Sequence, residues 1–501
     1  MNKLSSTYCL AALFALVVAL TSCNDWLDVR TETEQKEKDQ FSTVKGFETA
    51  LTGCYMQMAD QDAYGLRMTI TNIENLAHLW SLHSRTTRYE DKAMQDHDYK
   101  SDYSRSAVKA MYQSLFKAIS QANLIIANAE THKDVFTDEQ ERAVIVAEAH
   151  AIRAYCQMDV LRLFGQMPVN GKKAVSLPYS ESVNIDVLPP YYNFNDYVAK
   201  LTADLDKAET YLKVNDPIIK FPFERLNSTN ASYETNDYLI FRQFRLNYYA
   251  VRALRARLAL YTGDTAKAHE IAMELINAKD SEGKPVRALS GLSDFNNGYK
   301  ACPNECLFAL SKYDILSYIT SHLPSTADDA RFHTGNLTIS QQQLTDLYAG
   351  ENIASHNRYL NLWNQRVTDE YGKLWNGLTK YIFSDNASNK NLYYQLIPML
   401  RMSEIYLIAM EASTDLNEVN TLYKAYMTSH NVTTMPEFTS LDEAKTYIVN
   451  EYRREMFGEG QMFYTYKRIG ATTMLWDSTT LTEDAYILPL PETEFDPAKT
   501  N

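Results

Sequence analysis

Cys23 is the residue with the best-defined candidate chemistry. It follows Lys3, which supplies a positive charge, and an apolar run from Leu10 to Leu20. This run is shorter than the roughly 20 residues that a membrane-spanning helix needs, and the pattern is typical of a cleaved signal peptide. The sequence therefore predicts a signal peptide over residues 1–22 and an exported chain that begins at Cys23.

The residues beside the predicted cleavage site indicate that the Cys23 thiol is acylated. The run Leu20-Thr21-Ser22-Cys23 places a small residue before the cysteine and resembles the lipobox of bacterial lipoproteins. Each buried CH₂ of a palmitate-type chain contributes about 0.8 kcal/mol, so several chains on one cysteine hold a protein durably on a membrane. Residues 23–40 are then a lipidated, polar tether. The alternative is an ordinary cleaved signal with an incidental cysteine.

The remaining cysteines point to no second reaction. Cys302 and Cys306 could form a local disulfide or supply two metal ligands, but no His or Cys pair with zinc-site spacing accompanies them. Two ordinary thiols are the favoured interpretation, with a disulfide as the alternative. Cys54 and Cys156 are too few for a disulfide framework in a chain of 501 residues.

Recognisable catalytic motifs do not occur in the sequence. It has no G-x-S-x-G elbow, H-E-x-x-H helix, phosphate-binding loop or dinucleotide fingerprint. Five histidines show no metal-ligand spacing with one another: His78, His83, His97, His150 and His322. With 63 Asp and Glu, counting cannot exclude a glycosidase pair. Binding without a cofactor, metal or catalytic residue is the simpler interpretation.

Composition narrows the range of partners. The formal net charge of -14 leaves no basic surplus to neutralise phosphates, which argues against nucleic-acid binding. The 35 Tyr residues suit sugar or peptide binding, because the ring packs while the hydroxyl stays hydrated. The alternative for any one of them is a half-buried position on a helix.

Helical periodicity dominates the elements that must position these residues. Ala147, Ala151, Ala154, Met158 and Leu161 share one helix face, and similar faces occur at 250–261, 399–409 and 441–456. The helices form pairs with short turns: 108–129 with 138–164, 246–278, and 398–413 with 416–429. Gly263 is the expected helix stop of the second pair, and Gly263 and Ala268 have the spacing of a tetratricopeptide repeat. The predicted fold is mostly α.

Long irregular stretches separate the helical blocks, at 60–105, 165–195, 214–240 and 280–397. Long loops in a compact domain are usually functional. The segment 280–397 is expected to add short strands, such as Cys306–Leu310 and Lys380–Phe383. No composition break divides the chain, so residues 41–501 are predicted to form a single helical domain with a loop-rich insertion at about 280–397.

Six motifs in order along the chain resemble the SusD/RagB family. They are residues 23–28 (CNDWLD), 147–155 (AEAHAIRAY), 163–168 (LFGQMP), 255–264 (RARLALYTGD), 398–409 (PMLRMSEIYLIA) and 489–494 (PLPETE). The charged residues within them, Glu148 with Arg153 and Arg401 with Glu404, are interpreted as struts between helices rather than ligand contacts. Asp25, soon after the lipid cysteine, also resembles surface-export signals of Bacteroidetes lipoproteins.

The sequence departs from the family near its end. Tyr452 and Met462 stand where the family pattern has arginines, and Thr465 stands where it has an aspartate. The simultaneous loss of arginine and aspartate is expected if the two form a structural ion pair. This departure indicates a divergent subgroup and leaves the ligand class open.

The resemblance implies a tetratricopeptide-like scaffold and a surface-exposed, lipid-anchored protein of the cell outer membrane. Family members work beside a SusC-like, TonB-dependent barrel and deliver oligosaccharides, or peptides in some branches. The implied function is nutrient uptake of the polysaccharide-utilisation type. Two alternatives remain open: a surface-anchored glycoside hydrolase or peptidase, and a helical-repeat adaptor that binds only proteins.

The resemblance also implies where ligand contacts occur, at roughly 60–105 and 290–375. No ligand motif carries over residue by residue, so the candidates are polar and aromatic residues of those two regions. They are Tyr64, Arg67, Asn75, Trp80 and Arg85 in the first, and Tyr318, His322, Tyr359 and Trp363 in the second. Trp80 is the strongest candidate, since an aromatic face covers the C–H face of a sugar.

Overall fold

Helices form most of the computed structural model, which describes residues 32–82, 88–184, 187–233, 236–324, 337–369, 372–384, 386 and 391–495. The N-terminal helices are α2 (Glu32–Gln40), α3 (Val44–Met58), α4 (Asn72–Leu76), α5 (Tyr89–Gln95), α6 (Asp102–Thr131), α7 (Glu139–Phe164), α8 (Phe194–Asn215) and α9 (Phe223–Leu226). The later ones are α10 (Tyr248–Thr262), α11 (Thr265–Asn277), α12 (Leu292–Asn296), α13 (Ile315–Ile319), α14 (Gln341–Leu347), α15 (Asn357–Asn361), α16 (Met402–Ala412), α17 (Leu416–Ser429), α18 (Leu441–Glu455), α19 (Met462–Ile469) and α20 (Glu483–Tyr486). The predicted mostly α fold is confirmed.

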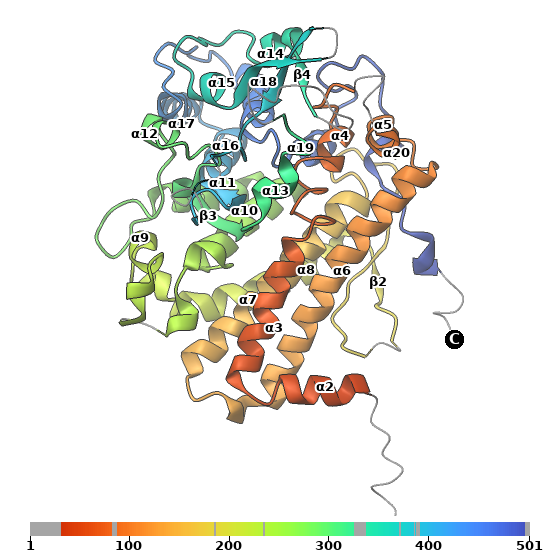
Figure 1. The fold of residues 1–501 in the computed structure, drawn as a ribbon, viewed down its shortest axis with the longest axis vertical. Helices are drawn as coiled ribbons and strands as arrows, with labels where there is room; N and C mark the ends of the chain where they lie inside the picture. Colours follow the sequence, from red (N-terminus) through yellow and green to blue (C-terminus); the bar gives the residue numbers. More distant parts are fainter. Residues whose placement is uncertain are drawn as a thin grey trace, which may run out of the picture.

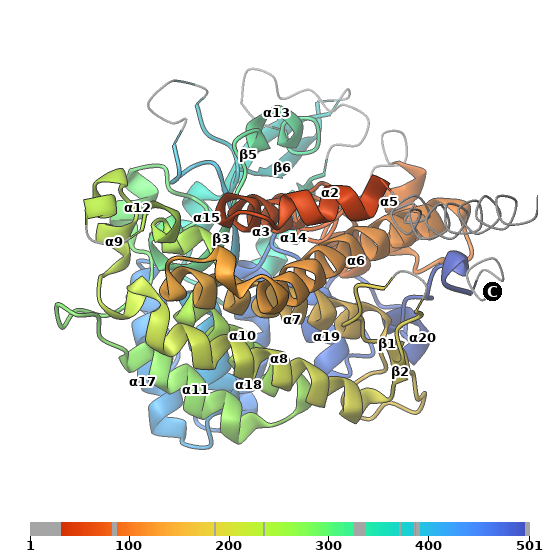
Figure 2. The same cartoon turned by 90° about the horizontal axis from the view of Figure 1, so that it is seen from below.

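The long helices stack in series. α6 packs on α3 and α7, α7 on α8, α8 on α10, and α10 on α11, which in turn contacts α16. Figure 1 shows α3, α6, α7 and α8 as one block, and Figure 2 shows α10, α11, α17 and α18 continuing from it. Each pair leaves an apolar face that only the next pair covers, as in helical-repeat proteins.

The turn between α10 and α11 follows the prediction. Gly263 takes a left-handed conformation with a φ of 85°, and its N–H donates to the last carbonyls of α10. Asp264 then caps α11 by accepting a hydrogen bond from the N–H of Lys267. The pairs α6–α7 and α16–α17 are also present at the predicted places.

Helix α7 lies at the centre of the stack and is buried along nearly its whole length. Two of its buried charged side chains, Glu148 and Arg153, have partners on other elements and not each other. Glu148 accepts from Arg242, and Arg153 donates to Asp204 through Nε at 2.8 Å. Arg401 and Glu404 also have separate partners, Arg401 in a carboxylate cluster and Glu404 on Arg257 of α10. All four act as struts between elements, because burial leaves no charge unpaired.

The C-terminal helices are tied to the stack at the end of α7. Lys467 of α19 is fully buried, and its Nζ donates to the carbonyls of Arg162 at 2.8 Å and Gly165 at 2.7 Å. These carbonyls belong to the last turn of α7 and to the residue that follows it, where helical partners are lacking. The ammonium therefore caps α7 and fixes α19 against it.

Short strands occur in three places. They are β1 (Leu177–Pro178) with β2 (Tyr191–Tyr192), β3 (Cys306–Ser311) with β7 (Leu396–Arg401), and β4 (Ile339–Ser340), β6 (Leu374–Leu378) and β5 (Trp363–Thr368) in one antiparallel sheet. The predicted strand at Cys306–Leu310 is confirmed as β3.

Two predictions of local structure are wrong. Residues 380–383 form no strand, because Lys380 and Tyr381 are held in a turn by hydrogen bonds to the carbonyls of Glu455 and Gly458. The helix predicted from residue 398 begins only at Met402, because 396–401 pair with β3. A short, fully buried apolar run does not distinguish a strand from a helix by its periodicity.

The structure describes only part of the predicted signal peptide and tether. Cys23 and the signal peptide lie outside the described residues, while 32–40 of the predicted tether form α2. Cys302 and Cys306 are buried free thiols, as are Cys54 and Cys156. Within the ranges given above, no helix has the length and apolar character to cross a membrane.

Candidate functional site

A depression of about 150 Å³ lies where α4, α5 and the end of α13 meet. Its walls come from the loop after α3, from the start of α4 and from Arg88 to Asp91, with His322 on the other side. We call it the Arg67 depression. Three cations or potential cations line it, Arg67, Arg88 and His322, together with Asp62, Glu90 and Asp91.

Carboxylates and an amide fix the Arg67 side chain. Its Nε donates to Asp62 at 2.7 Å, and its Nη1 donates to Asn72 at 3.1 Å and pairs with Glu90. The side chain is 24% exposed, so the guanidinium is held in place and still reaches solvent. A planar guanidinium fixed this way can address two hydroxyls or a carboxylate of a ligand.

His322 completes the opposite wall. Its Nε2 accepts from Arg88 Nη1 at 2.8 Å, and its Nδ1 donates to the Tyr318 carbonyl at 3.2 Å. Burial lowers the pKa of His322, and the nearby Arg88 and Arg67 lower it further. The imidazole is therefore neutral at pH 7 and orients Arg88.

Asp91 and Tyr318 brace the Arg67 depression from behind. Burial raises the pKa of Asp91 to about 6, and its Oδ1 accepts from Asn75 Nδ2 at 2.9 Å. Tyr318 Oη donates to the Gly65 carbonyl at 2.8 Å, which joins α13 to the loop after α3. The Arg67 depression is thus built from two regions that lie far apart in the sequence.

The structure brings together four of the nine candidate ligand residues. Arg67 and His322 line the Arg67 depression, and Asn75 and Tyr318 support it through the contacts described above. Tyr359 is half-buried and packs its ring edge-on against Tyr348. Arg85 lies outside the described residues.

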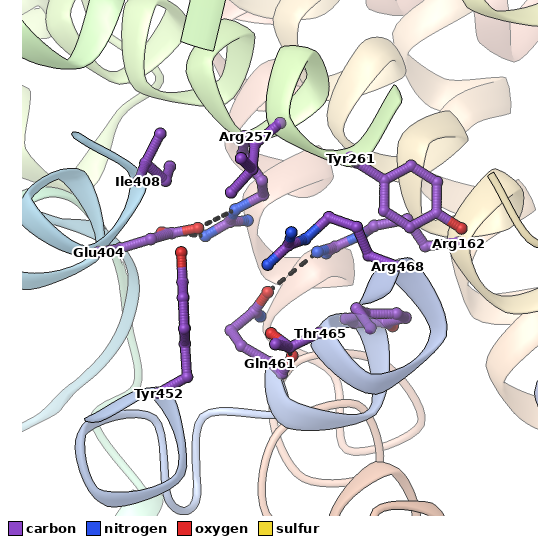
Figure 3. Close-up of a pocket in the computed structure, with 11 residues that line it drawn as sticks. Arg162, Arg257, Tyr261, Glu404, Ile408, Tyr452, Gln461, Thr465 and Arg468 are labelled. Carbon is purple, nitrogen blue, oxygen red and sulfur yellow. Dashed lines mark hydrogen bonds and ion pairs between the residues drawn. The ribbon is translucent and has the colours of Figure 1, made fainter. Parts of the chain in front are cut away.

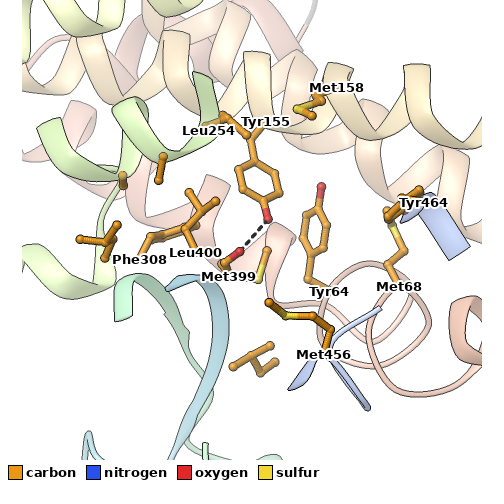
Figure 4. Packing of buried hydrophobic residues seen from close by; sticks show 14 of the residues in the cluster. Tyr64, Met68, Tyr155, Met158, Leu254, Phe308, Met399, Leu400, Met456 and Tyr464 are labelled. Atoms are coloured by element: carbon orange, nitrogen blue, oxygen red, sulfur yellow. Dashed lines mark hydrogen bonds between the residues drawn. The ribbon is translucent and has the colours of Figure 1, made fainter. Parts of the chain in front are cut away.

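Three aromatic candidates belong to the core, and the prediction that they face a ligand is wrong for this structure. Trp80 is 1% exposed, donates from Nε1 to the Ile70 carbonyl at 2.8 Å and packs edge-on against Phe457. Trp363 is also buried and packs edge-on against Phe457. Tyr64 packs edge-on against Tyr155 in the core (Figure 4), and its hydroxyl donates to Asp159. A large aromatic residue in a loop sequence can still be the anchor of that loop.

Exposed tyrosines that sequence reasoning missed lie close to the Arg67 depression in the chain. Tyr89 directly follows Arg88 and is 74% exposed, and its ring stacks on Tyr103 with centroids 5.3 Å apart. Both lie in the region 60–105 from which ligand contacts were expected. The adjoining Arg88-Tyr89-Glu90 was the available signal, since exposed tyrosine beside charge is typical of binding surfaces.

A second group of tyrosines lies near the start of β7. Tyr299 stacks on Tyr393 with centroids 5.2 Å apart and meets Tyr394 edge-on. The Gln395 amide donates to the carbonyl of Tyr313, whose side chain is 79% exposed. We call these four residues the Tyr299 cluster. The doublet at 393–394 was a usable signal, but it lies outside the region 290–375.

Comparison with known proteins places this fold in one class. Residues 322–495 match the model of the SusD family. SusD-like protein P2 of Formosa agariphila is 22% identical over 96% of this chain and 95% of its own length. Solved structures with this fold include a SusD superfamily protein from Bacteroides thetaiotaomicron (TM-score 0.66, 20% identity, 91% of this chain and 98% of that one).

A second solved structure carries a name that states its ligand class. It is surface glycan-binding protein A from Bacteroides uniformis, with a TM-score of 0.65 and 16% identity over 91% of this chain and 98% of that one. At these identities the solved structures establish a shared fold. With the matched family model, they confirm the SusD/RagB resemblance: the chain shares the fold of these proteins along most of its length, and residues 322–495 match the SusD family model.

Proposed function

We propose that this protein is a non-catalytic, lipid-anchored nutrient-binding protein of the outer cell surface. It captures an oligosaccharide, or a peptide, at the Arg67 depression and passes it to a partner SusC-like, TonB-dependent barrel. Acylated Cys23 holds it on the membrane. No cofactor or metal takes part in this proposal.

The observation that carries the proposal is the Arg67 depression with the exposed Tyr89–Tyr103 pair next to it in the chain. Arg67 and Arg88 offer fixed donors, Glu90 and Asp62 offer acceptors, and the stacked rings offer an apolar face. Sugars need this combination, because their hydroxyls are donors and acceptors while their C–H faces are apolar. The family match and the glycan-binding title of a protein with this fold support the same class of ligand.

The binding test uses the chain that begins after Cys23, titrated with neutral oligosaccharides and with peptides in a calorimeter. We expect Tyr89→Ala and Arg67→Ala each to weaken binding of the selected ligand roughly tenfold, as the loss of one ring face or one charged hydrogen bond does. Arg105→Ala is the matched control, because Arg105 is exposed and pairs with Glu492 away from the Arg67 depression.

A parallel variant separates the two tyrosine surfaces. Tyr313→Ala removes an exposed ring of the Tyr299 cluster and leaves the Arg67 depression intact. If Tyr313→Ala abolishes binding while Tyr89→Ala does not, the ligand binds at the Tyr299 cluster and the proposed site is wrong. Turnover of the ligand by the purified protein would replace the proposal with an enzymatic one.

The membrane part of the proposal has its own test. We expect the protein to incorporate a labelled fatty acid in cells, and Cys23→Ser to abolish the label and release the chain from the membrane. Detergent extracts of the labelled cells should contain a complex with an outer-membrane barrel. Recovery of unlabelled protein from the cytosol would contradict the proposed location and the transport role.

A further inference from the structure

A cavity of about 30 Å³ lies where the C-terminal helices meet the helical stack, away from the Arg67 depression. Its walls come from α7, α10, α16, α18, α19 and the residue before α19, so five helices share it. Figure 3 shows Glu404 and Arg257 on one side and Gln461, Thr465 and Arg468 on the other. The residues that decide its chemistry are Arg162, Arg257, Arg468, Glu404 and Tyr452.

Positive charge prevails on the wall of this cavity. Three guanidiniums line it, those of Arg162, Arg257 and Arg468, but only one carboxylate, that of Glu404. The other two carboxylates that pair with these arginines, Asp159 and Glu411, are not among the lining residues. A ligand in the cavity is therefore closer to the three guanidiniums than to the carboxylates of Asp159 and Glu411.

The cavity wall also has more donors than acceptors. Both Glu404 oxygens already accept from Arg257, at 2.6 and 2.7 Å, and Gln461 Oε1 accepts from Arg162 at 3.0 Å. Tyr452 is 4% exposed, and its hydroxyl has no hydrogen-bond partner among the described residues. In Figure 3 this hydroxyl points into the space below Glu404 and Arg257. The hydroxyls of two further lining residues, Tyr261 and Tyr464, also have no partner in the described part of the chain.

We propose that this cavity is a binding site for one chloride-sized anion, which accepts from Tyr452 and from the arginines that line it. An anion accepts every donor around it, whereas a water molecule must also place two protons of its own. The cavity has room for a water-sized sphere at more than one position, so a monatomic halide fits in it.

The bound anion would join the two halves of the molecule. Arg162 and Arg257 belong to the N-terminal stack, and Tyr452 and Arg468 belong to α18 and α19. Tyr452 and Thr465 are also two of the positions at which the sequence departs from the family pattern, and they line the same cavity. A mobile anion would thus supply a negative charge where the pattern has aspartate.

Crystallography with bromide tests occupancy directly. Crystals of the chain that begins after Cys23, grown without chloride, are soaked in sodium bromide and measured at the bromine edge. We expect an anomalous peak between Tyr452 Oη and the guanidiniums of Arg257 and Arg468. Ordinary water density with no anomalous peak would overturn the proposal.

Thermal unfolding shows whether the anion matters to the protein. We expect Tm to rise by on the order of 1–2 °C in sodium chloride over sodium gluconate of equal ionic strength. Tyr452→Phe should weaken the apparent chloride affinity roughly tenfold. Thr465→Asp should abolish the chloride-specific rise, because it places a fixed negative charge in the site.

A matched control guards against a general effect of losing a buried hydroxyl. Tyr423 is 1% exposed and its hydroxyl also lacks a partner among the described residues, but it does not line the cavity. Tyr423→Phe should therefore keep the full chloride-specific rise. A bromide peak without any chloride-specific change in Tm would mean an adventitious ion only, and would also overturn the proposal.

Discussion

Glu74 of α4 is a fully buried carboxyl group that burial keeps protonated. One of its oxygens accepts from the Gly460 N–H at 2.7 Å, while the other has no partner among the described residues. Burial raises the pKa of Glu74 to about 8, although hydrogen bonds from the Gly460 and Gly458 backbone oppose the rise. At neutral pH the folded protein therefore binds a proton here that the unfolded chain releases.

The sign of the pH effect follows from this raised pKa. The stabilising contribution is complete below the unfolded value of about 4.5 and is lost as the pH rises towards 8. We expect Glu74→Gln, which keeps the shape without the charge, to raise the free energy of unfolding at pH 8 by on the order of 2–4 kcal/mol. At pH 4.5 the difference should vanish. Urea unfolding at both pH values measures it, and an equal effect at the two would contradict the raised pKa.

The residue types suggested candidates for the ligand site, but they did not show which candidates are buried in the core. Arg67 and His322 were among the polar candidates of the two loop regions, and both line the Arg67 depression. Trp80 was misassigned, because its burial depends on Phe457 and the Ile70 carbonyl, and Phe457 is distant in the sequence. The sequence could not show that contact.

At the scale of elements, the connection between α18 and α19 has little room for side chains. Gly460 has a φ of 72°, and a Cβ there would lie 2.2 Å from the Met68 carbonyl oxygen. Gly263, at the end of α10, has a φ of 85° but open space around its Cβ position. Substitution at Gly460 therefore tests steric conflict together with backbone strain, whereas substitution at Gly263 tests backbone strain alone.

We expect Gly460→Ala to lower the free energy of unfolding by about 3 kcal/mol or more, since backbone must move to admit the methyl group. Gly263→Ala should cost about 1 kcal/mol, from strain alone. Chemical denaturation of both variants compares them. Equal costs would show that the α18–α19 connection yields freely and that the close approach to Met68 does not matter.

Strand β7 ends in a buried cluster that joins it to α18. Arg401 donates to Glu459 at 2.8 Å through both Nε and Nη2, and it also pairs with Glu305 and Glu455. Removing the guanidinium leaves three buried carboxylates without their shared cation. The cluster therefore gives Arg401, in the motif at 398–409, a structural role.

We expect Arg401→Met to lower the free energy of unfolding by about 3–5 kcal/mol. The control is Arg105→Met, which breaks an exposed pair with Glu492 and should cost less than about 1 kcal/mol. Thermal or urea unfolding of the two variants gives the comparison. Similar small losses in both would mean that the buried cluster contributes little to stability.

Most long helices were predictable from the sequence, whereas among the short strands β3 was predicted and the sheet of β4, β5 and β6 was not. The pair α10–α11 has clear local signals: helical periodicity, a helix stop at Gly263 and an N-cap at Asp264. β5 and β6 are short, and β6 pairs with both β4 and β5. No local pattern specifies such a sheet. The motif at 398–409 was predicted to be one helix, because its apolar first residues are compatible with either a buried helix or a buried strand.

For the whole molecule, the stacked scaffold follows from the sequence, while the site lies on loops that the scaffold brings together. The Arg67 depression joins the segment around 61–91 to residue 322 through Tyr318 and Gly65. Such a contact depends on the complete fold, so single residues of the site could be guessed but their arrangement could not.

Four histidines make the molecule sensitive to acid: His97, which is half-buried, and His150, His356 and His430, which are buried. Burial lowers the pKa of His97 to about 4, with His78 lowering it further, and burial is also the main reason for the lowered pKa of His150, His356 and His430. His356 and His430 stack with centroids 5.9 Å apart, and Arg358 lowers the pKa of both. Because these pKa values are lower in the folded protein than in the unfolded chain, unfolding at acidic pH takes up protons.

We expect the free energy of unfolding to fall as the pH drops from 6.5 towards 4, by up to about 1.4 kcal/mol per pH unit for each such histidine. Buried carboxyl groups with raised pKa values, among them Glu74 and Asp91, oppose this fall over the same range, so the contribution of a single histidine is measured with a variant. Urea unfolding at pH 7, 6 and 5 measures the slope. His97→Asn should reduce that slope by about one proton, because it removes one titrating group of the unfolded chain. An unchanged slope in this variant would mean that His97 stays protonated in the folded protein, despite its burial beside His78.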